Sequence, residues 1–251
     1  MIDKGWCGKM KAVILAAGKG TRMLPLTEQC PKALLPVCKQ DTILDLLVQN
    51  INHINEIDEV IIVIAQNQYL YFQRWNRYKN IKFIVSPIDN NVIECLDYVI
   101  NKIGLDNYLI AASDNILMFK IQEFVSFYNK ERKLPAVMYY KENSINELKR
   151  TGVADIKNNI VVSMVEKPEI PIYDYAIPPF YIIPQSHINY LREFLDTGLR
   201  VDSLGSFLSW YSKKTEVRAF CMPDKRYNLG DKTSYIKYIE ETSKGEGEEN
   251  D

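Results

Sequence analysis

Short apolar runs alternate with longer amphipathic stretches along the first part of the chain. The runs are rich in β-branched and aromatic residues, which is typical of buried strands. The intervening stretches carry apolar residues at helical spacing, as Ile93, Leu96, Val99 and Ile100 do. The predicted strands are Lys11–Leu15, Glu59–Ala65, Ile81–Val85, Tyr108–Ala112 and Ala136–Tyr140, and the predicted helices are Ile43–Ile54, Asn67–Arg77, Val92–Ile103 and Ile121–Asn129. This alternation predicts crossover units and a mostly parallel sheet covered by helices.

The pattern changes after about residue 143, where strand-like runs follow one another with little helix between them. Helical patterns then return twice, and one further strand and one further helix follow. The strand-like runs are Gly152–Ile156, Ile160–Val165, Ala176–Ile183 and Glu216–Cys221, and the helical ones are Ser186–Leu195, Asp202–Lys213 and Asp231–Glu241. We predict one α/β domain over residues 1–242, Rossmann-like and three-layered (α/β/α), with a mixed sheet and a β-rich elaboration. Residues 243–251 are polar, acidic and broken by glycine, which predicts a disordered tail.

Composition and charge argue against several classes of protein. The 251 residues include 31 Lys+Arg and 32 Asp+Glu, so the net charge is −1, and a broad nucleic-acid-binding surface is not expected. Any affinity for phosphate must come from a local cluster. No apolar run approaches the roughly 18 residues of a membrane span, and residues 1–11 lack the core of a secretory signal. We therefore expect no membrane partner and a cytoplasmic location.

Histidine and cysteine chemistry has little support in this sequence. There are two histidines, and the five cysteines form no CxxC pair, which excludes a zinc ribbon and disfavours a disulfide framework. We expect both histidines to be structural. Catalysis would then depend on carboxylates, lysines and arginines.

A glycine-rich loop, Ala16-Ala17-Gly18-Lys19-Gly20-Thr21-Arg22, follows the first predicted strand. The carboxyl end of such a strand is where open α/β sheets bind phosphate-bearing ligands, and glycines let backbone amides approach an anion closely. The spacing of this loop does not match either of two known phosphate-binding motifs. GxGxxG needs glycine where Met23 stands, and a Walker loop needs Ser or Thr where Gly20 stands. By itself, a glycine-rich turn also has purely structural uses.

The loop continues into a longer signature, LAAGKGTRMLPLT followed by PKALLPV at residues 31–37. This signature resembles that of the sugar-1-phosphate nucleotidyltransferases, or nucleoside-diphosphate-sugar pyrophosphorylases, in a short form without a C-terminal β-helix. The resemblance covers residues 10–240 and implies a nucleotide-binding half at 10–142 and an acceptor-binding half at 143–242. It implies Mg²⁺-dependent transfer from a nucleoside triphosphate to a sugar 1-phosphate, with release of pyrophosphate. It also implies that Arg22 contacts the triphosphate and Lys32 neutralises it, both as catalytic residues.

Later motifs extend the resemblance. Ser113-Asp114-Asn115 is similar to the family's GDN segment, which implies that Asp114 holds Mg²⁺. Without the resemblance, Asp114 could also be a helix cap or a turn residue. Val165-Glu166-Lys167-Pro168 resembles the EKP motif, where Glu166 would bind sugar hydroxyls and Lys167 would be catalytic at the sugar phosphate. Gly152 resembles the glycine turn beside the sugar. The nucleotide-binding residues implied by the resemblance are Leu15, Ala16, Ala17, Gly18, Gly20, Thr21, Ser86 and Asn91.

The last motif departs from the family pattern. Residues 227–235 are similar to DIGTPEDY, but Asn228 stands where an aspartate usually shares the metal with Asp114. An amide oxygen can bind Mg²⁺ without negative charge, so Asn228 is expected to hold the metal weakly. Asp231 is either a substitute ligand or a helix cap, and the cap is the preferred interpretation.

Two stretches that would set the substrate also depart from the commonest pattern. Asn90-Asn91 is closer to the phosphocholine cytidylyltransferase branch, and Pro179 stands where a sugar-side glycine is usual. Two alternatives therefore stay open: a cytidylyltransferase acting on phosphocholine or another non-sugar phosphomonoester, and a catalytically weak nucleotide-sugar-binding domain, which Asn228, Ser113 and Pro179 together motivate. The base, the sugar and the oligomeric state, a homo-oligomer included, are left open by the sequence.

Overall fold

The computed structural model describes residues 9–38, 40–88, 91–199 and 203–248. The strands are β1 (Met10–Leu15), β2 (Ile57–Ala65), β3 (Ile81–Ser86), β4 (Asn107–Ala112), β5 (Asn115–Leu117), β6 (Ala136–Lys141), β7 (Gly152–Lys157), β8 (Ile160–Glu166), β9 (Tyr175–Ile177), β10 (Phe180–Ile183), β11 (Arg218–Cys221) and β12 (Arg226–Asn228). The α-helices are α1 (Ile43–Asn52), α2 (Tyr69–Trp75), α3 (Val92–Ile103), α4 (Ile121–Asn129), α5 (Ile145–Leu148), α6 (Asn189–Asp196), α7 (Leu204–Tyr211) and α8 (Lys232–Glu248).

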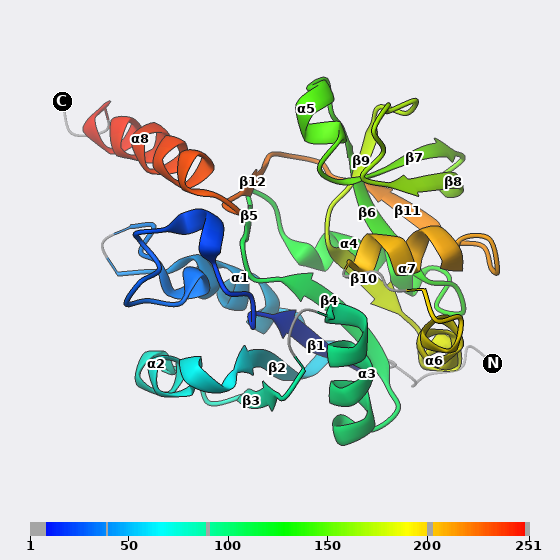
Figure 1. Ribbon diagram of the computed structural model, residues 1–251, viewed down its shortest axis with the longest axis horizontal. Helices are drawn as coiled ribbons and strands as arrows, with labels where there is room; N and C mark the ends of the chain where they lie inside the picture. Colours follow the sequence, from blue (N-terminus) through cyan, green and yellow to red (C-terminus); the bar gives the residue numbers. More distant parts are fainter. Residues whose placement is uncertain (1–8, 39, 89–90, 200–202, 249–251) are drawn as a thin grey trace, which may run out of the picture.

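The first half is a parallel sheet between two layers of helices (Figure 1). Strands β4, β1, β2 and β3 lie side by side and parallel. Alternate residues of β1 face opposite ways: Val13 packs in the cluster that includes α3, α6 and α7, and Ala12 and Ile14 pack in the cluster of α1 and α4. Burial of a side chain as large as that of Val13 or Ile14 contributes about 1.5–3 kcal/mol. The predicted three-layer α/β/α fold is confirmed.

Strand β6, at the end of the first half, and four strands of the second half form a closed ring. β6 pairs with β9, β9 with β7, β7 with β8, β8 with β11, and β11 with β6 again, all antiparallel except the last pair. Strand β10 runs antiparallel to both β4 and β6 and joins the two halves into one sheet. The strand predicted at 176–183 is two strands, β9 and β10, because Pro178 and Pro179 have no amide N–H to donate to a ladder.

Helix α8 is longer than the sequence pattern predicts and points away from the sheet in Figure 1. It continues to Glu248, so the helix extends into the tail that the sequence predicts to be disordered, and residues 249–251 lie outside the described residues. Once the packed turn of Tyr235 and Tyr238 has formed, each further residue adds a hydrogen bond, and Lys and Glu are good helix formers. A glycine costs only about 1 kcal/mol there.

Over the described residues, no helix combines the length and the apolar character that crossing a bilayer requires.

Candidate functional site

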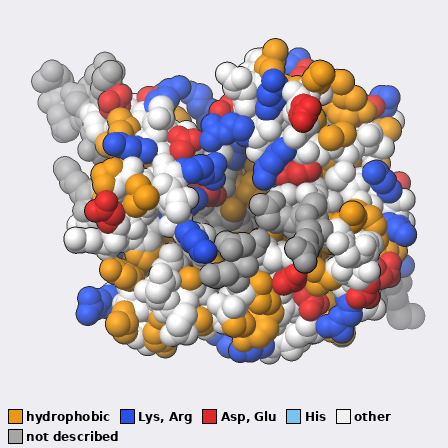
Figure 2. All heavy atoms as spheres, in the orientation of Figure 1, with side chains coloured by type: hydrophobic (Ala, Val, Ile, Leu, Met, Phe, Trp, Pro, Cys, Tyr) orange, Lys and Arg blue, Asp and Glu red, His pale blue; other side chains and the backbone are white. Residues whose placement is uncertain are grey.

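A cleft of about 570 Å³ lies between the two halves, at the carboxyl ends of β1 and β4. Figure 2 shows Lys and Arg side chains gathered around a hollow on this face. Counted over the described lining residues, six cationic side chains stand against three carboxylates: Lys19, Arg22, Lys32, Arg150, Lys167 and Arg226 against Asp114, Glu147 and Glu166. The cleft is therefore a basic cluster on a chain of net charge −1. Such a cluster suits polyanionic ligands.

Most of the predicted site residues line this one cleft. These are Leu15, Ala16, Ala17, Gly18, Arg22, Lys32, Asn91, Asp114, Gly152, Glu166, Lys167 and Asn228. Gly20, Thr21 and Ser86 do not line it. Gly20 has φ +66° and its carbonyl accepts a hydrogen bond from Thr27 Oγ1 at 2.9 Å, so it shapes the loop from outside the cleft. Thr21 is exposed at the start of a 3₁₀ turn, Thr21–Met23.

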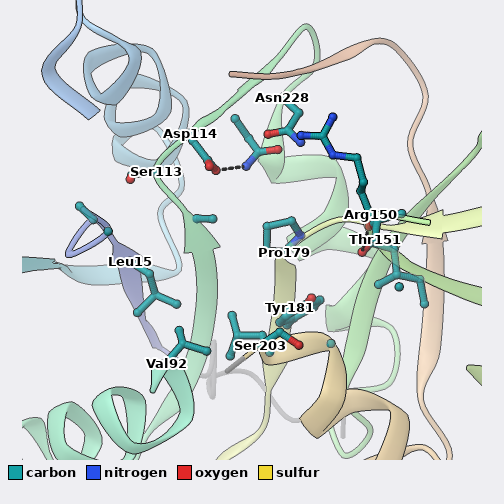
Figure 3. Close-up of a pocket in the computed structure, with 18 of the residues that line it drawn as sticks. Leu15, Val92, Ser113, Asp114, Arg150, Thr151, Pro179, Tyr181, Ser203 and Asn228 are labelled. Atoms are coloured by element: carbon teal, nitrogen blue, oxygen red, sulfur yellow. Dashed lines mark hydrogen bonds between the residues drawn. The ribbon is translucent and has the colours of Figure 1, made fainter. Parts of the chain in front are cut away.

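Lys32 and Asp114 form a close ion pair in the cleft. Lys32 Nζ lies 2.5 Å from Asp114 Oδ2, and the two side chains are only 15% and 19% exposed. The Nδ2 group of Asn115 donates to Asp114 Oδ1 at 2.7 Å, the contact drawn in Figure 3. Burial would raise the pKa of Asp114, but the charge and hydrogen bond of Lys32, with the charge of Arg226, hold this pKa below its usual value. Asp114 is therefore an anion at neutral pH.

Arg226 supports Asp114 through Asn115. Its Nη1 donates to Asn115 Oδ1 at 2.5 Å, and its Nη2 donates to the Tyr140 hydroxyl at 2.8 Å. β12 pairs antiparallel with β5, so that Asn228 lies opposite Asn115. Arg226 and Asn228 are two residues apart and share one face of β12. Sequence reasoning missed Arg226, although this period of two from Asn228 was a usable signal.

Arg22 and Asn228 converge beside Asp114. The amide of Leu229 donates to the Asp114 carbonyl at 2.8 Å, which ties the last motif to the end of β4. A methyl group placed on Gly230 would lie 3.0 Å from Asn228 Oδ1 and 3.7 Å from Arg22 Nη2. Figure 3 shows Asp114 and Asn228 at the same end of the cleft.

The oxygen donors at this end fit Mg²⁺. They include the carboxylate of Asp114 and the amide oxygen of Asn228, and no group of three His, Cys, Asp or Glu that could hold a metal occurs among the described residues. Magnesium is commonly held by one or two carboxylates together with substrate phosphates and water, so a set this small is sufficient in kind.

Asp231 caps helix α8, as the preferred interpretation predicts. Its Oδ1 accepts a hydrogen bond from the Ser234 amide at 3.0 Å, and its Oδ2 accepts one from Arg150 Nη2 at 2.9 Å. The hydrogen bonds from Ser234 and Arg150 lower the pKa of Asp231 to about 2 despite partial burial. Arg150, the residue before Thr151-Gly152, was also missed by sequence reasoning.

Two glycines make room for the carboxylate of Glu166. A methyl group on Gly205 would lie 1.8 Å from Glu166 Oε2, and one on Gly152 would lie 3.0 Å from the same atom. The Glu166 side chain is only 14% exposed, and its Oε1 lies 3.7 Å from Lys167 Nζ. Glycine at both positions therefore lets a carboxylate lie deep in the acceptor half of the cleft.

Lys167 has an unusual backbone conformation. Its φ is +44°, a left-handed value that costs a non-glycine residue about 1–2 kcal/mol. Its amide donates to the Thr151 carbonyl at 3.1 Å, which holds the turn against the start of β7. The ammonium group is left at the rim of the cleft, where it lines the wall with Glu166. Strain of this kind occurs at binding sites whose surroundings over-determine the conformation.

The opposite end of the cleft is apolar. Leu15, Ile88, Val92 and Cys95 line it, and Figure 3 shows Leu15 and Val92 facing into it. Asn91 Oδ1 accepts hydrogen bonds from the Ile93 and Glu94 amides at 3.1 and 3.2 Å, so this predicted nucleotide-binding residue caps α3.

Ser86, the other residue predicted at this end, is buried, and its hydroxyl accepts a hydrogen bond from the Ile88 amide at 3.1 Å. Asn90, whose pairing with Asn91 favours the phosphocholine branch, lies outside the described residues.

Three curated proteins similar to this chain include two that are named as nucleotidyltransferases of glucose 1-phosphate. The chain is 28% identical over 192 residues to the bifunctional protein GlmU of Methanocaldococcus jannaschii, covering 72% of this chain and 43% of that protein. It is 25% identical over 190 residues to glucose-1-phosphate thymidylyltransferase of Neisseria meningitidis, covering 73% and 65%. It is 22% identical over 263 residues to UTP–glucose-1-phosphate uridylyltransferase 1 of Staphylococcus saprophyticus, covering 90% of each. The chain thus spans less than two thirds of the first two relatives.

Solved structures share the fold. A UDP-glucose pyrophosphorylase complexed with UDP-glucose has a TM-score of 0.81 at 18% identity, covering 94% of this chain and 99% of that one. The UDP-glucose pyrophosphorylase from Acinetobacter baumannii has a TM-score of 0.77 at 17% identity, covering 92% of each chain. The family model described as nucleotidyl transferase matches residues 11–245. Because this match spans both halves and every motif of the cleft, the chain belongs to the nucleotidyl transferase family.

Proposed function

We propose that this chain transfers a nucleotidyl group from a pyrimidine nucleoside triphosphate to a sugar 1-phosphate, with Mg²⁺, and releases pyrophosphate. The observation that carries the proposal is the convergence of Arg22, Lys32 and Asp114 on one wall of the basic cleft, with Glu166 and Lys167 on the acceptor wall. The relatives named thymidylyl- and uridylyltransferases act on glucose 1-phosphate by their names, which favours a pyrimidine base and a sugar acceptor over phosphocholine.

The reaction depends on neutralising the negative charge of the two substrates more than on covalent catalysis by the protein. An oxygen of the sugar phosphate attacks the α-phosphorus, a new P–O bond forms, and the bond from the α-phosphorus to the bridging oxygen breaks, so that pyrophosphate leaves with the electron pair. Two polyanions must meet for this to happen. We assign Arg22, with its planar fork of donors, and Lys32, a movable point charge, to the triphosphate. One donor aimed at developing charge is worth on the order of 3 kcal/mol.

The acceptor would lie against the other wall. We assign Lys167 to the phosphate of the sugar phosphate and Glu166 to sugar hydroxyls, with Gly152 leaving space beside the carboxylate. Glu166 accepts hydrogen bonds from hydroxyl groups and cannot serve a phosphate, so the two neighbouring residues orient opposite ends of the acceptor. The apolar end lined by Leu15 and Val92 is assigned to the base.

The metal would be held by Asp114 and Asn228 together with substrate oxygens. When bound, Mg²⁺ withdraws negative charge from the phosphate oxygens. Because Asn228 adds no charge, Asp114 supplies the formal protein anion there, and Lys32 competes with the metal for Asp114 Oδ2. We therefore propose that Mg²⁺ binds more weakly than at a pair of carboxylates.

A substrate screen tests the proposal. The protein is incubated with each nucleoside triphosphate, Mg²⁺ and either one of several sugar 1-phosphates or phosphocholine, and pyrophosphate is measured. The proposal expects release with UTP or dTTP and a sugar 1-phosphate. Release with CTP and phosphocholine alone would favour the cytidylyltransferase, and nucleotide binding without any release would favour a binding domain.

We place the activity in the cytoplasm, where cysteines such as Cys30 and Cys95 stay reduced.

A further inference from the structure

Arg150 lies where a second cation could reach the acceptor phosphate. It lines the cleft and immediately precedes Thr151, whose carbonyl accepts the hydrogen bond from the Lys167 amide at 3.1 Å. Arg150 and Lys167 therefore leave two adjacent strand ends at the same rim. Figure 3 shows the Arg150 side chain extending from the acceptor wall toward Asn228, at the end of the cleft that holds Asp114.

The present partners of Arg150 hold it only loosely. Nη2 lies 2.9 Å from Asp231 Oδ2, and Nη1 lies 3.4 Å from Glu147 Oε1. The Arg150 side chain is 48% exposed, and its partners are 22% and 45% exposed, so solvent screens both ion pairs. Exposed pairs of this kind contribute little to stability. A phosphate dianion offers a guanidinium two parallel charge-assisted hydrogen bonds, which are stronger.

Releasing Arg150 would leave the helix cap in place. The two carboxylate oxygens of Asp231 have separate tasks, because Oδ1 accepts from the Ser234 amide and Oδ2 accepts from Arg150. Helix α8 therefore keeps its cap whether or not the guanidinium is bound. Asp231 therefore binds the Arg150 guanidinium near the cleft without needing it for the helix cap.

We propose that Arg150 is an acceptor-binding residue, which lies on Asp231 in the free protein and moves its guanidinium to the sugar phosphate when the acceptor binds. The inference builds on the proposed function and adds a residue to it. Lys167 and Arg150 together then clamp the acceptor phosphate from one rim, and Arg22 and Lys32 serve the triphosphate from the other. Asp231 competes with the acceptor for Arg150, so it limits acceptor affinity.

Four variants test this competition by steady-state kinetics: Arg150→Ala, Arg150→Lys, Asp231→Asn and the double variant Arg150→Ala with Asp231→Asn. Arg150→Ala should raise the KM for the sugar 1-phosphate at least about tenfold, because charge-assisted hydrogen bonds are lost, with the KM for the triphosphate within about twofold. Arg150→Lys should recover part of this loss, since a point charge replaces the fork. Asp231→Asn keeps a good cap but frees Arg150, so it should lower the acceptor KM. The double variant should match Arg150→Ala.

Lys149→Ala is the matched control, because it removes the neighbouring positive charge from an exposed residue that does not line the cleft. Its acceptor KM should not change. Isothermal titration with glucose 1-phosphate alone separates this inference from the proposed function. Failure of the wild type to release pyrophosphate with any pair refutes the function, whereas equal glucose 1-phosphate affinity in wild type and Arg150→Ala refutes the role of Arg150. A higher acceptor KM in Asp231→Asn would also refute it, and would make the pair a structural tie between α8 and β7.

Discussion

The substitution Gly205→Ala should damage acceptor binding, although it places a better helix former inside α7. Alanine is normally favoured over glycine in a helix by about 1 kcal/mol. Here the added Cβ would lie 1.8 Å from Glu166 Oε2 and 2.4 Å from Glu166 Cδ, so the buried carboxylate must move. Overpacking costs typically about 1–3 kcal/mol. Set against the helix term, the net loss of unfolding free energy should be about 0–2 kcal/mol.

The effect on turnover should be larger than the effect on stability. Moving the carboxylate by an ångström or more takes it out of hydrogen-bond reach of a sugar hydroxyl, and a misplacement of that size can cost about a hundredfold in rate. We expect kcat/KM for the sugar 1-phosphate to fall by about that factor, with the KM for the triphosphate nearly unchanged. Urea unfolding and steady-state kinetics on the same preparation measure both quantities.

A double variant identifies the cause. In the Glu166→Ala background the space is empty, so adding Gly205→Ala should stabilise the protein by up to about 1 kcal/mol. If Gly205→Ala still destabilises that background, the obstruction is not Glu166. If Gly205→Ala alone stabilises the protein and leaves acceptor kinetics intact, the carboxylate does not occupy the space against α7, and the reasoning fails.

Four further predictions concern charges. Arg22→Ala should lower kcat/KM at least about a hundredfold in a folded protein, and near-normal turnover would contradict its assignment. Lys167→Ala should raise the KM of the acceptor and Lys32→Ala that of the triphosphate; the reverse pattern in steady-state kinetics would exchange the two roles. Asn228→Asp should lower the Mg²⁺ concentration for half-maximal rate in a titration, since a second carboxylate joins the site. Asp45 is buried in α1 and accepts hydrogen bonds from the side chains of Thr42, Trp75 and Tyr78. Burial opposes its ionisation, yet these hydrogen bonds hold its pKa below the usual value, so its stabilising effect is present above the unfolded-state pKa of about 4 and is lost as pH falls further; Asp45→Asn should flatten this acid limb in urea unfolding.

The crossover half could be predicted closely from the sequence because its signals are local and strong. The helices expected at Val92–Ile103 and Ile121–Asn129 have those bounds in the structure, since their apolar faces repeat every three to four residues over several turns. The helix expected at Asn67–Arg77 is shorter, α2, and is preceded by a 3₁₀ turn. Boundaries depend on caps and tertiary contacts that periodicity does not contain.

The closed ring and the paired charges could not be predicted in the same way. The ring depends on which strands pair, and β6 and β11 are far apart in sequence. Lys32 and Asp114 are 82 positions apart, and their contact follows only once β1 and β4 are neighbours. Arg150 and Arg226 belong to no quoted motif. The spacing of two residues between Arg226 and Asn228 was the one sequence signal for Arg226, and the position of Arg150 in the cleft became visible only with the fold.

The most direct test of the account follows the α-phosphate. The wild type is incubated with Mg²⁺, glucose 1-phosphate and UTP or dTTP labelled at the α-phosphorus, and products are separated. The account predicts label in a sugar nucleotide, with one pyrophosphate released per molecule, only when sugar phosphate and Mg²⁺ are both present, and no product from Asp114→Asn. Label that stays in the triphosphate across a panel of sugar 1-phosphates, or that appears as free nucleoside monophosphate without acceptor, would contradict it.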